Sequence, residues 1–238
     1  MTTTMLLQLA LAVIPAILAI TLHEAAHGYA ALALGDDTAR TAGRLSLNPL
    51  RHVDTMGTLI IPGVLLLSQL LLAGKIYFMF GWAKPVPVSP WRFRDPRRGM
   101  ALVALAGPAM NFVLAWLAAL LLTGVDQVPL GGLETAVVQF LIYFMLSNIV
   151  LGLFNLLPIP PLDGGRVAVG FLPLGMARVW ARLEGYGIVI VLAVVFIMPR
   201  VIGFDPVGAA LNHLIPWSFQ TLFWLAGHSA DGPYAGSF

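Results

Sequence analysis

Residues 5–34 read MLLQLALAVIPAILAITLHEAAHGYAALAL, and this stretch carries no charged side chain before Glu24. It is longer than the ~20 apolar residues that a membrane-spanning helix needs. It also exceeds the apolar core of a secretory signal peptide, which is roughly 7–15 residues long, so we expect the helix to be retained. Pro15 predicts a kink within this helix, and Gly35 predicts its end.

The composition of the whole chain supports the same class of protein. Of its 238 residues, 59% are hydrophobic and 10% are charged, and the mean hydropathy is +0.88. A soluble domain has about 25% charged residues, so we expect an integral protein of a lipid bilayer with no separate soluble domain. The 13 basic residues are spread along the chain, which argues against a nucleic-acid partner. Cysteine is absent, so any metal site must use His, Asp or Glu.

The apolar segments predict a single all-α membrane domain over residues 1–238, with five or six membrane segments. Between the first and third segments lies IYFMFGWAKPVPV at 76–88, an aromatic and proline-rich stretch that we expect to be extended rather than helical. The expected elements are a helix at 5–34, a re-entrant element at 57–88, helices at 100–123 and 136–157, and further apolar segments at 186–202 and 207–226.

The basic residues decide the expected topology. Arginines gather at 40–51 and again at 92–98, on either side of the 57–88 element. Cytoplasmic loops attract Lys and Arg, so we expect helix 57–73 to rise into the membrane and residues 76–88 to return. Extended backbone at that depth must be buried in protein or line a water-filled cavity. This topology places Arg44 and Arg97 on the cytoplasmic side.

The first helix contains the motif His23-Glu24-Ala25-Ala26-His27. Residues four apart share a helix face, so two imidazoles can converge on one zinc ion while Glu24 points to the water bound there. The alternative is a pair of packing or pore histidines beside a buried glutamate. Ionisable residues inside a membrane are costly and usually functional, and three of them within five positions favour the metal site.

A catalytic zinc site usually has a third protein ligand, and Asp163 is the strongest candidate. It follows an apolar segment within FNLLPIPPLDGG at 154–165, where prolines break the helix and Gly164 and Gly165 permit close approach of the backbone. The alternative for Asp163 is an aspartate that caps a new helix. The other acids and histidines that we considered lie in polar loops: Asp36, Asp37, His52, Asp54, Asp95 and Asp126.

Two motifs together resemble those of a known family. His23-Glu24-x-x-His27 with Asn155-x-x-Pro158-x-Pro160-x-Leu162-Asp163-Gly164 is similar to the pattern of the site-2 proteases, a family of intramembrane zinc metalloproteases. The stretches GRLSLNPL at 43–50, FGWAKPVPV at 80–88 and AGPAMN at 106–111 resemble its compact bacterial branch, which lacks a PDZ domain. The resemblance extends from about Leu22 to Arg166, and the catalytic pattern shows no departure from the family.

The resemblance implies one zinc ion held by His23, His27 and Asp163, with Glu24 as general base and acid. It also implies that Asn155 holds the substrate or stabilises the oxyanion, although an interhelical hydrogen bond is an equal alternative for this amide. We expect Asn111, by contrast, to join helices rather than to act in catalysis.

The expected function is hydrolysis of peptide bonds in or near the transmembrane segments of single-span membrane proteins. We expect the active site near the cytoplasmic face of a bacterial inner membrane, with residues 76–88 offering a strand edge to an unwound substrate. The alternative is a non-enzymatic scaffold or a metal-binding transporter that uses the same histidine pair, although few further polar residues line the segments as a transporter requires. The sequence identifies neither the substrate nor a regulatory membrane protein.

Overall fold

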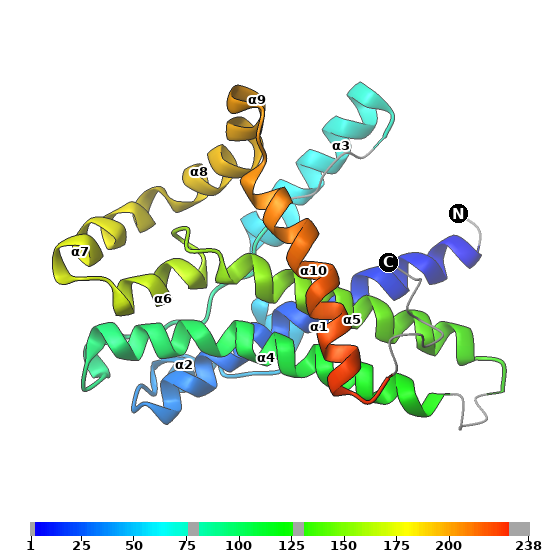
Figure 1. The fold of residues 1–238 in the computed structure, drawn as a ribbon, viewed down its shortest axis with the longest axis horizontal. Helices are drawn as coiled ribbons and strands as arrows, with labels where there is room; N and C mark the ends of the chain where they lie inside the picture. Colours follow the sequence, from blue (N-terminus) through cyan, green and yellow to red (C-terminus); the bar gives the residue numbers. More distant parts are fainter. Residues whose placement is uncertain (1–2, 76–80, 126–130, 229–238) are drawn as a thin grey trace.

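Three long helices form the body of the computed structural model, which describes residues 3–75, 81–125 and 131–228. These helices are α1 (Thr3–Ala33), α4 (Pro96–Val125) and α5 (Glu134–Leu156), and they lie side by side along the longest axis (Figure 1). Helices α1 and α5 run in one direction and α4 runs in the other. The C-terminal part of α1, the start of α4 and the end of α5 therefore face the same half of the body.

Small residues on α4 explain how closely the helices approach. Ala115, Ala118 and Ala119 are fully buried on one face of α4, where they contact the buried side chains of Met145 and Ile149 on α5. Helix α10 (Pro206–Leu225) covers this cluster with aromatic and aliphatic side chains near its C-terminal end. Small residues are typical of helix interfaces in membranes, because they let two backbones come into contact.

The remaining helices are shorter and surround this body. A π-helical turn at Thr55–Ile60 leads into α3, and α7 to α9 follow one another with only short turns between them. Helix α3 and the α8–α9 run project from the same side of the body (Figure 1). The bounds are α2 Thr38–Thr41, α3 Ile61–Ala73, α6 Asp163–Phe171, α7 Leu174–Leu183, α8 Gly187–Leu192 and α9 Met198–Ile202.

The all-α class is confirmed for the residues that the structure describes, and the chain is an integral membrane protein. Four helical stretches are long and apolar enough to cross a membrane, Leu6–Ala33, Pro96–Val125, Glu134–Leu156 and Leu174–Ile202. The expected count of five or six is not confirmed. The helix at Thr55–Gln69 is too short to be a fifth, and α10 is interrupted by polar residues such as Asn212, His213 and Gln220.

The extended element expected at 76–88 is not confirmed either. Residues 76–80 lie outside the described part of the chain, and residues 81–89 form no strand. Backbone bonds nevertheless fix this segment, because Trp82 N–H donates to Gly57 O at 3.0 Å and Lys84 N–H donates to His52 O at 2.8 Å. A Cβ on Gly81 would lie 2.4 Å from Gly57 O, so this close approach depends on glycine.

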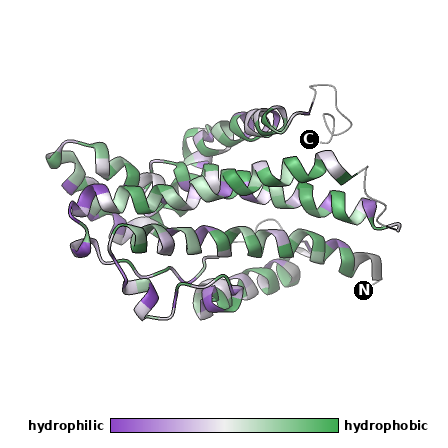
Figure 2. Cartoon of the chain, turned by 90° about the horizontal axis from the view of Figure 1, so that it is seen from below, coloured by the Kyte–Doolittle hydropathy of each residue, from purple (hydrophilic) through white to green (hydrophobic). Residues whose placement is uncertain are grey.

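The two basic loops meet at one end of the body. Asp36 is fully buried after α1 and accepts bonds from the Thr38 side chain and from the backbone of Ser89 at 2.6 Å. Arg92 forms ion pairs with Asp36 and Asp37, which join the two loops directly. Burial raises the pKa of the Asp36 carboxyl, but the hydrogen bonds from Thr38 and Ser89 and the charge of Arg92 hold that pKa below its usual value. Hydrophilic residues gather at this end, opposite the N terminus (Figure 2). The loops thus share one side of the protein, and the cytoplasmic identity of that side stays a prediction.

Candidate active site

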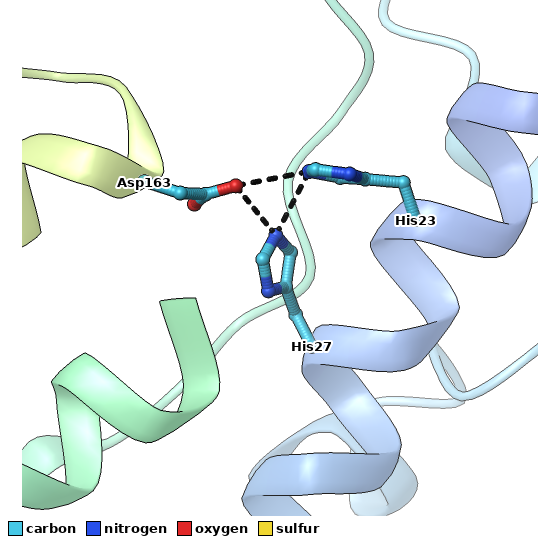
Figure 3. Close-up of side chains that lie close together, drawn as sticks. All are labelled: His23, His27 and Asp163. Carbon is cyan, nitrogen blue, oxygen red and sulfur yellow. Dashed lines mark hydrogen bonds and ion pairs between the residues drawn. The ribbon is translucent and has the colours of Figure 1, made fainter. Parts of the chain in front are cut away.

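Two helices bring the three candidate metal ligands together. His23 and His27 project from one face of α1, and Asp163 is the first residue of α6 (Figure 3). The two Nε2 atoms lie 3.1 Å apart. The Oδ2 atom of Asp163 lies 3.0 Å from Nε2 of His23 and 3.3 Å from Nε2 of His27. All three side chains are largely shielded from solvent.

The opposite nitrogens of both imidazoles are held by α4. Nδ1 of His23 lies 2.5 Å from Oδ1 of Asn111, and Nδ1 of His27 lies 2.7 Å from the carbonyl oxygen of Val103. Histidine ligands of metals nearly always donate their second ring N–H to a carbonyl or carboxylate, which fixes the ring orientation. Helix α4 therefore aims both Nε2 atoms at the point that Asp163 faces.

This arrangement fits a small metal cation. Oδ2 of Asp163 is buried and accepts no hydrogen bond from the described residues, and a buried carboxylate oxygen without a partner is costly. Ligand atoms about 2.0–2.1 Å from a tetrahedral zinc ion lie about 3.3 Å from one another, which agrees with the observed separations. Two imidazoles and one carboxylate, with a fourth position left for water, are a ligand set used by catalytic zinc sites.

Glycines explain how Asp163 reaches the histidines. Helix α5 ends at Leu156, and the chain then turns back on itself before α6. A Cβ on Gly164 would lie 2.2 Å from Leu156 O, and one on Gly165 would lie 2.8 Å from the nitrogen of Pro160. The N-cap position of α6 belongs to Leu162, which makes no side-chain cap, and Asp163 lies one residue further on, so the capping alternative has no support in the geometry.

Gly107 of α4 lies directly against both imidazole rings. A Cβ at this position would lie 2.6 Å from Cε1 of His23 and 2.5 Å from Cε1 of His27. Real Cβ atoms do not approach ring atoms this closely, so any larger residue must push the two rings away from Asp163.

Gly107→Ala is expected to weaken metal binding strongly. Alanine stabilises a helix interior by about 0.5–1 kcal/mol relative to glycine, so a loss cannot come from the helix itself. Gly124→Ala in the same helix is the matched control, because its Cβ would have nothing within 4 Å. Metal content after dialysis is the measurement, and equal metal content in the two variants would contradict the contact.

Glu24 is held by the segment that follows α3. Its Oε2 atom accepts a hydrogen bond from the backbone N–H of Val86 at 3.0 Å. Val86 is buried, and its side chain lies near Gly28, one turn further along α1. Proline occupies both 85 and 87, and proline has no N–H. Val86 therefore has the one backbone N–H in Pro85-Val86-Pro87, and this N–H donates to Glu24.

Asn155 is hydrogen-bonded within its own helix. It is half-buried near the end of α5, and its Nδ2 donates to Leu151 O at 3.0 Å in its own helix. Its role in catalysis stays a prediction. Other candidate ligands of the sequence have local partners, since His52 contacts Ser46 O and Asp54 accepts from Gly57 N. Asp126 lies outside the described residues, and among those that are described the group that could hold a metal ion is His23, His27 and Asp163.

Sequence reasoning missed three contributors to the site, which are Asn148, the backbone of Val86 and the contact from Asn111. We expected Asn111 to join helices, and it does so, but it also binds His23. The available signal was a polar amide within an apolar helix, because such groups are costly unless they have a specific partner. A backbone donor such as that of Val86 has no signature in residue type.

Comparisons with known proteins identify similar sequences. The model of peptidase family M50 matches residues 124–198. The chain is 41% identical over 192 residues to "Putative zinc metalloprotease YwhC" of Bacillus subtilis, covering 79% of this chain and 80% of that protein. It is 30% identical over 224 residues to "Putative zinc metalloprotease Rip2" of Mycolicibacterium smegmatis, covering 92% and 73%. No solved structure matches the chain.

Proposed function

Since the chain belongs to peptidase family M50, the site-2 proteases, and is a metalloendopeptidase, we propose that it cleaves membrane proteins within the bilayer as a zinc enzyme. Its substrates are single-span membrane proteins, cut in or near their transmembrane segments. The observation that carries the proposal is the group of His23, His27 and Asp163, two of which lie on a helix apolar enough to span a membrane. The alternative of a non-enzymatic scaffold or transporter has no support from the relatives.

His23, His27 and Asp163 hold the zinc ion in this proposal. Zinc lowers the pKa of a water molecule from 15.7 to about 7 and polarises the scissile carbonyl group. The carboxylate of Glu24 takes a proton from the attacking water and passes it to the leaving amine. Val86 N–H holds one oxygen of this carboxylate, which leaves the other oxygen for the proton. Asn155 donates to the developing oxyanion after its side chain leaves Leu151 O.

Val86→Pro tests whether the backbone amide positions Glu24. The variant removes the N–H that Glu24 accepts, and we expect the cleavage rate to fall by up to about 10²-fold, since small misplacements of a catalytic group have effects of this order. Zinc content should stay unchanged, because no ligand is touched. Lys84→Pro is the control, because it removes the bond to His52 O from the same segment and leaves Glu24 its donor. Equal rates in the two variants would argue against a positioning role.

We propose that the active site lies toward the cytoplasmic side of a bacterial inner membrane. The two basic loops support this, because they meet at the end of the body where α1 ends and α4 begins, and basic loops are retained in the cytoplasm. Residues 57–88 then enter and leave the membrane on the same side.

Introduced cysteines test this orientation, because the native chain has none. Leu50 and Arg98 are exposed in the two basic regions, 40–51 and 92–98, and Leu133 is exposed at the opposite end, before α5. In intact cells, a membrane-impermeant thiol reagent should label Leu133→Cys and leave Leu50→Cys and Arg98→Cys unlabelled. Permeabilised cells should label all three. Labelling of Arg98→Cys but not Leu50→Cys in intact cells would mean that the segment between them crosses the membrane fully.

The substrate class is tested by comparing membrane proteins from cells with and without the active enzyme. Single-span proteins should accumulate uncut in cells that carry the Glu24→Gln variant. Each candidate is then cleaved by the purified enzyme in detergent, with and without a zinc chelator. Cleavage that persists in the chelator would contradict a zinc mechanism, and accumulation of soluble proteins alone would contradict the substrate class.

A further inference from the structure

We infer that Asn148 and Asn111 form a polar relay that fixes the tautomer of His23 and so presents the lone pair of its Nε2 to the metal. This inference rests on the proposed function, since it assigns a positioning role toward the zinc ion. The relay runs from Phe144 O on α5 through both amides to the imidazole on α1. Neither asparagine touches the ion or the substrate.

The relay has a fixed starting point at a backbone carbonyl. Asn148 lies 2.8 Å from Phe144 O, one turn earlier in α5. A carbonyl oxygen only accepts hydrogen bonds, so the amide of Asn148 must turn its NH₂ toward Phe144. Its oxygen then faces Asn111, which lies at 2.8 Å on α4.

The direction set at Asn148 passes to His23. Because the oxygen of Asn148 faces Asn111, Asn111 must present its NH₂ there and its own Oδ1 to the imidazole. Oδ1 lies 2.5 Å from Nδ1 of His23, and an amide oxygen only accepts. His23 therefore carries its hydrogen on Nδ1 and keeps the lone pair on Nε2, the atom that faces His27 and Asp163.

Burial makes the reversed relay costly. Asn111 and Asn148 are both fully buried, so water cannot replace a lost partner. Turning Asn111 over would place NH₂ against Nδ1 of His23 and move the ring hydrogen to Nε2, where it would occupy the metal position. Asn148 would have to turn as well, and its oxygen would then face Phe144 O. Two buried acceptors without a hydrogen between them are unfavourable.

The same tautomer of His27 is fixed without an intervening side chain. Its Nδ1 lies 2.7 Å from Val103 O, so a backbone carbonyl sets its tautomer directly. His23 lies deeper in the apolar body, where Asn111 supplies the acceptor instead. Close helix contact makes this relay fit, because a Cβ on Gly152 of α5 would lie 3.3 Å from Cβ of Asn111.

The test is zinc affinity, measured by competition with a chelator on the purified full chain. Asn111→Leu should weaken zinc binding about 10–100-fold, the usual effect of losing the partner of a histidine ligand. Asn111→Asp keeps an oxygen acceptor for Nδ1, so it should bind zinc more tightly than Asn111→Leu, while its second oxygen faces the oxygen of Asn148 and should lower the thermal stability. Asn148→Leu leaves Asn111 free to turn over, so it should weaken binding by less than Asn111→Leu does.

A control separates the relay from simple packing. Met145→Ala opens a space in the fully buried face of α5, one turn before Ile149, and should lower thermal stability without changing zinc affinity. If Asn111→Leu binds zinc as tightly as the native chain, the relay is overturned while the proposed zinc site stands. If the native chain binds no zinc at His23, the proposed function fails and the relay fails with it.

Nitrogen NMR of the metal-free chain gives a second measurement if a leucine variant does not fold. The ring signals of His23 are assigned by their loss in His23→Gln. The native chain should show hydrogen on Nδ1, and Asn111→Asp should keep it there. A native His23 without hydrogen on Nδ1 would overturn the relay directly.

Discussion

Asp163→Ala is expected to reduce zinc from about one ion per chain to nearly none at low free metal, and to reduce cleavage to background. The expectation follows from the site, because Oδ2 of Asp163 faces both Nε2 atoms and accepts no hydrogen bond from the described residues. Two imidazoles alone would fill only two of the four ligand positions of a tetrahedral zinc ion. Metal content by elemental analysis and cleavage by the purified chain are the measurements.

Asp163→Ser separates metal binding from helix capping. Serine is as good a helix cap as aspartate, but it is a poor zinc ligand. If Asp163 served α6 only as a cap, Asp163→Ser would keep both zinc and activity. We expect it to lose both while the fold remains intact. Full zinc occupancy in either variant would mean that another acidic residue, not Asp163, is the third zinc ligand.

Glu24→Gln is expected to reduce the cleavage rate about 10²–10⁴-fold, the usual contribution of a general acid–base group, with zinc content unchanged. Glutamine has the same shape, and its oxygen can still accept from Val86 N–H, so the local structure should persist. The amide cannot take a proton from water near neutral pH. The measurement is the initial rate on a purified single-span substrate.

Glu184→Gln provides the matched control for this substitution. Glu184 is a half-buried residue whose carboxylate pairs with Arg166 and which is not in the group of His23, His27 and Asp163, so its loss should leave the rate within experimental error. A Glu24→Gln enzyme that retained most of its rate would mean that the proton is transferred by another group, and the assignment of Glu24 would have to be withdrawn.

The grouping of the three candidate ligands could be predicted from the sequence, because each part has a local signature. The i, i+4 spacing places His23 and His27 on one helix face whatever the surroundings. The prolines and glycines around Asp163 predict a sharp turn after an apolar helix, and the structure has this turn between α5 and α6. The all-α class follows in the same way from the length of the apolar segments, since length and hydropathy are local properties of the chain.

The supporting contacts were not accessible, because they depend on which helices become neighbours. Asn111 lies eighty-eight positions from His23 along the chain, and its local sequence does not indicate which side chain it will contact. The number of spans is not confirmed, for a different reason. Apolar residues are favoured both against lipid and inside a protein, so hydropathy alone does not decide whether segment 207–226 spans the membrane. In the structure, α10 packs across α4 and α5.

The order in which the ligands are synthesised has a consequence for the cell. His23 and His27 enter the membrane with α1, whereas Asp163 is added much later. At roughly 5–20 residues per second, the interval is on the order of ten seconds. With His23, His27 and Asp163 as the proposed ligands, the growing chain has no complete ligand set throughout this interval, so it cannot cleave the helices beside it in the insertion machinery. Biosynthesis thereby delays proteolysis until the helix that follows α5 has been made.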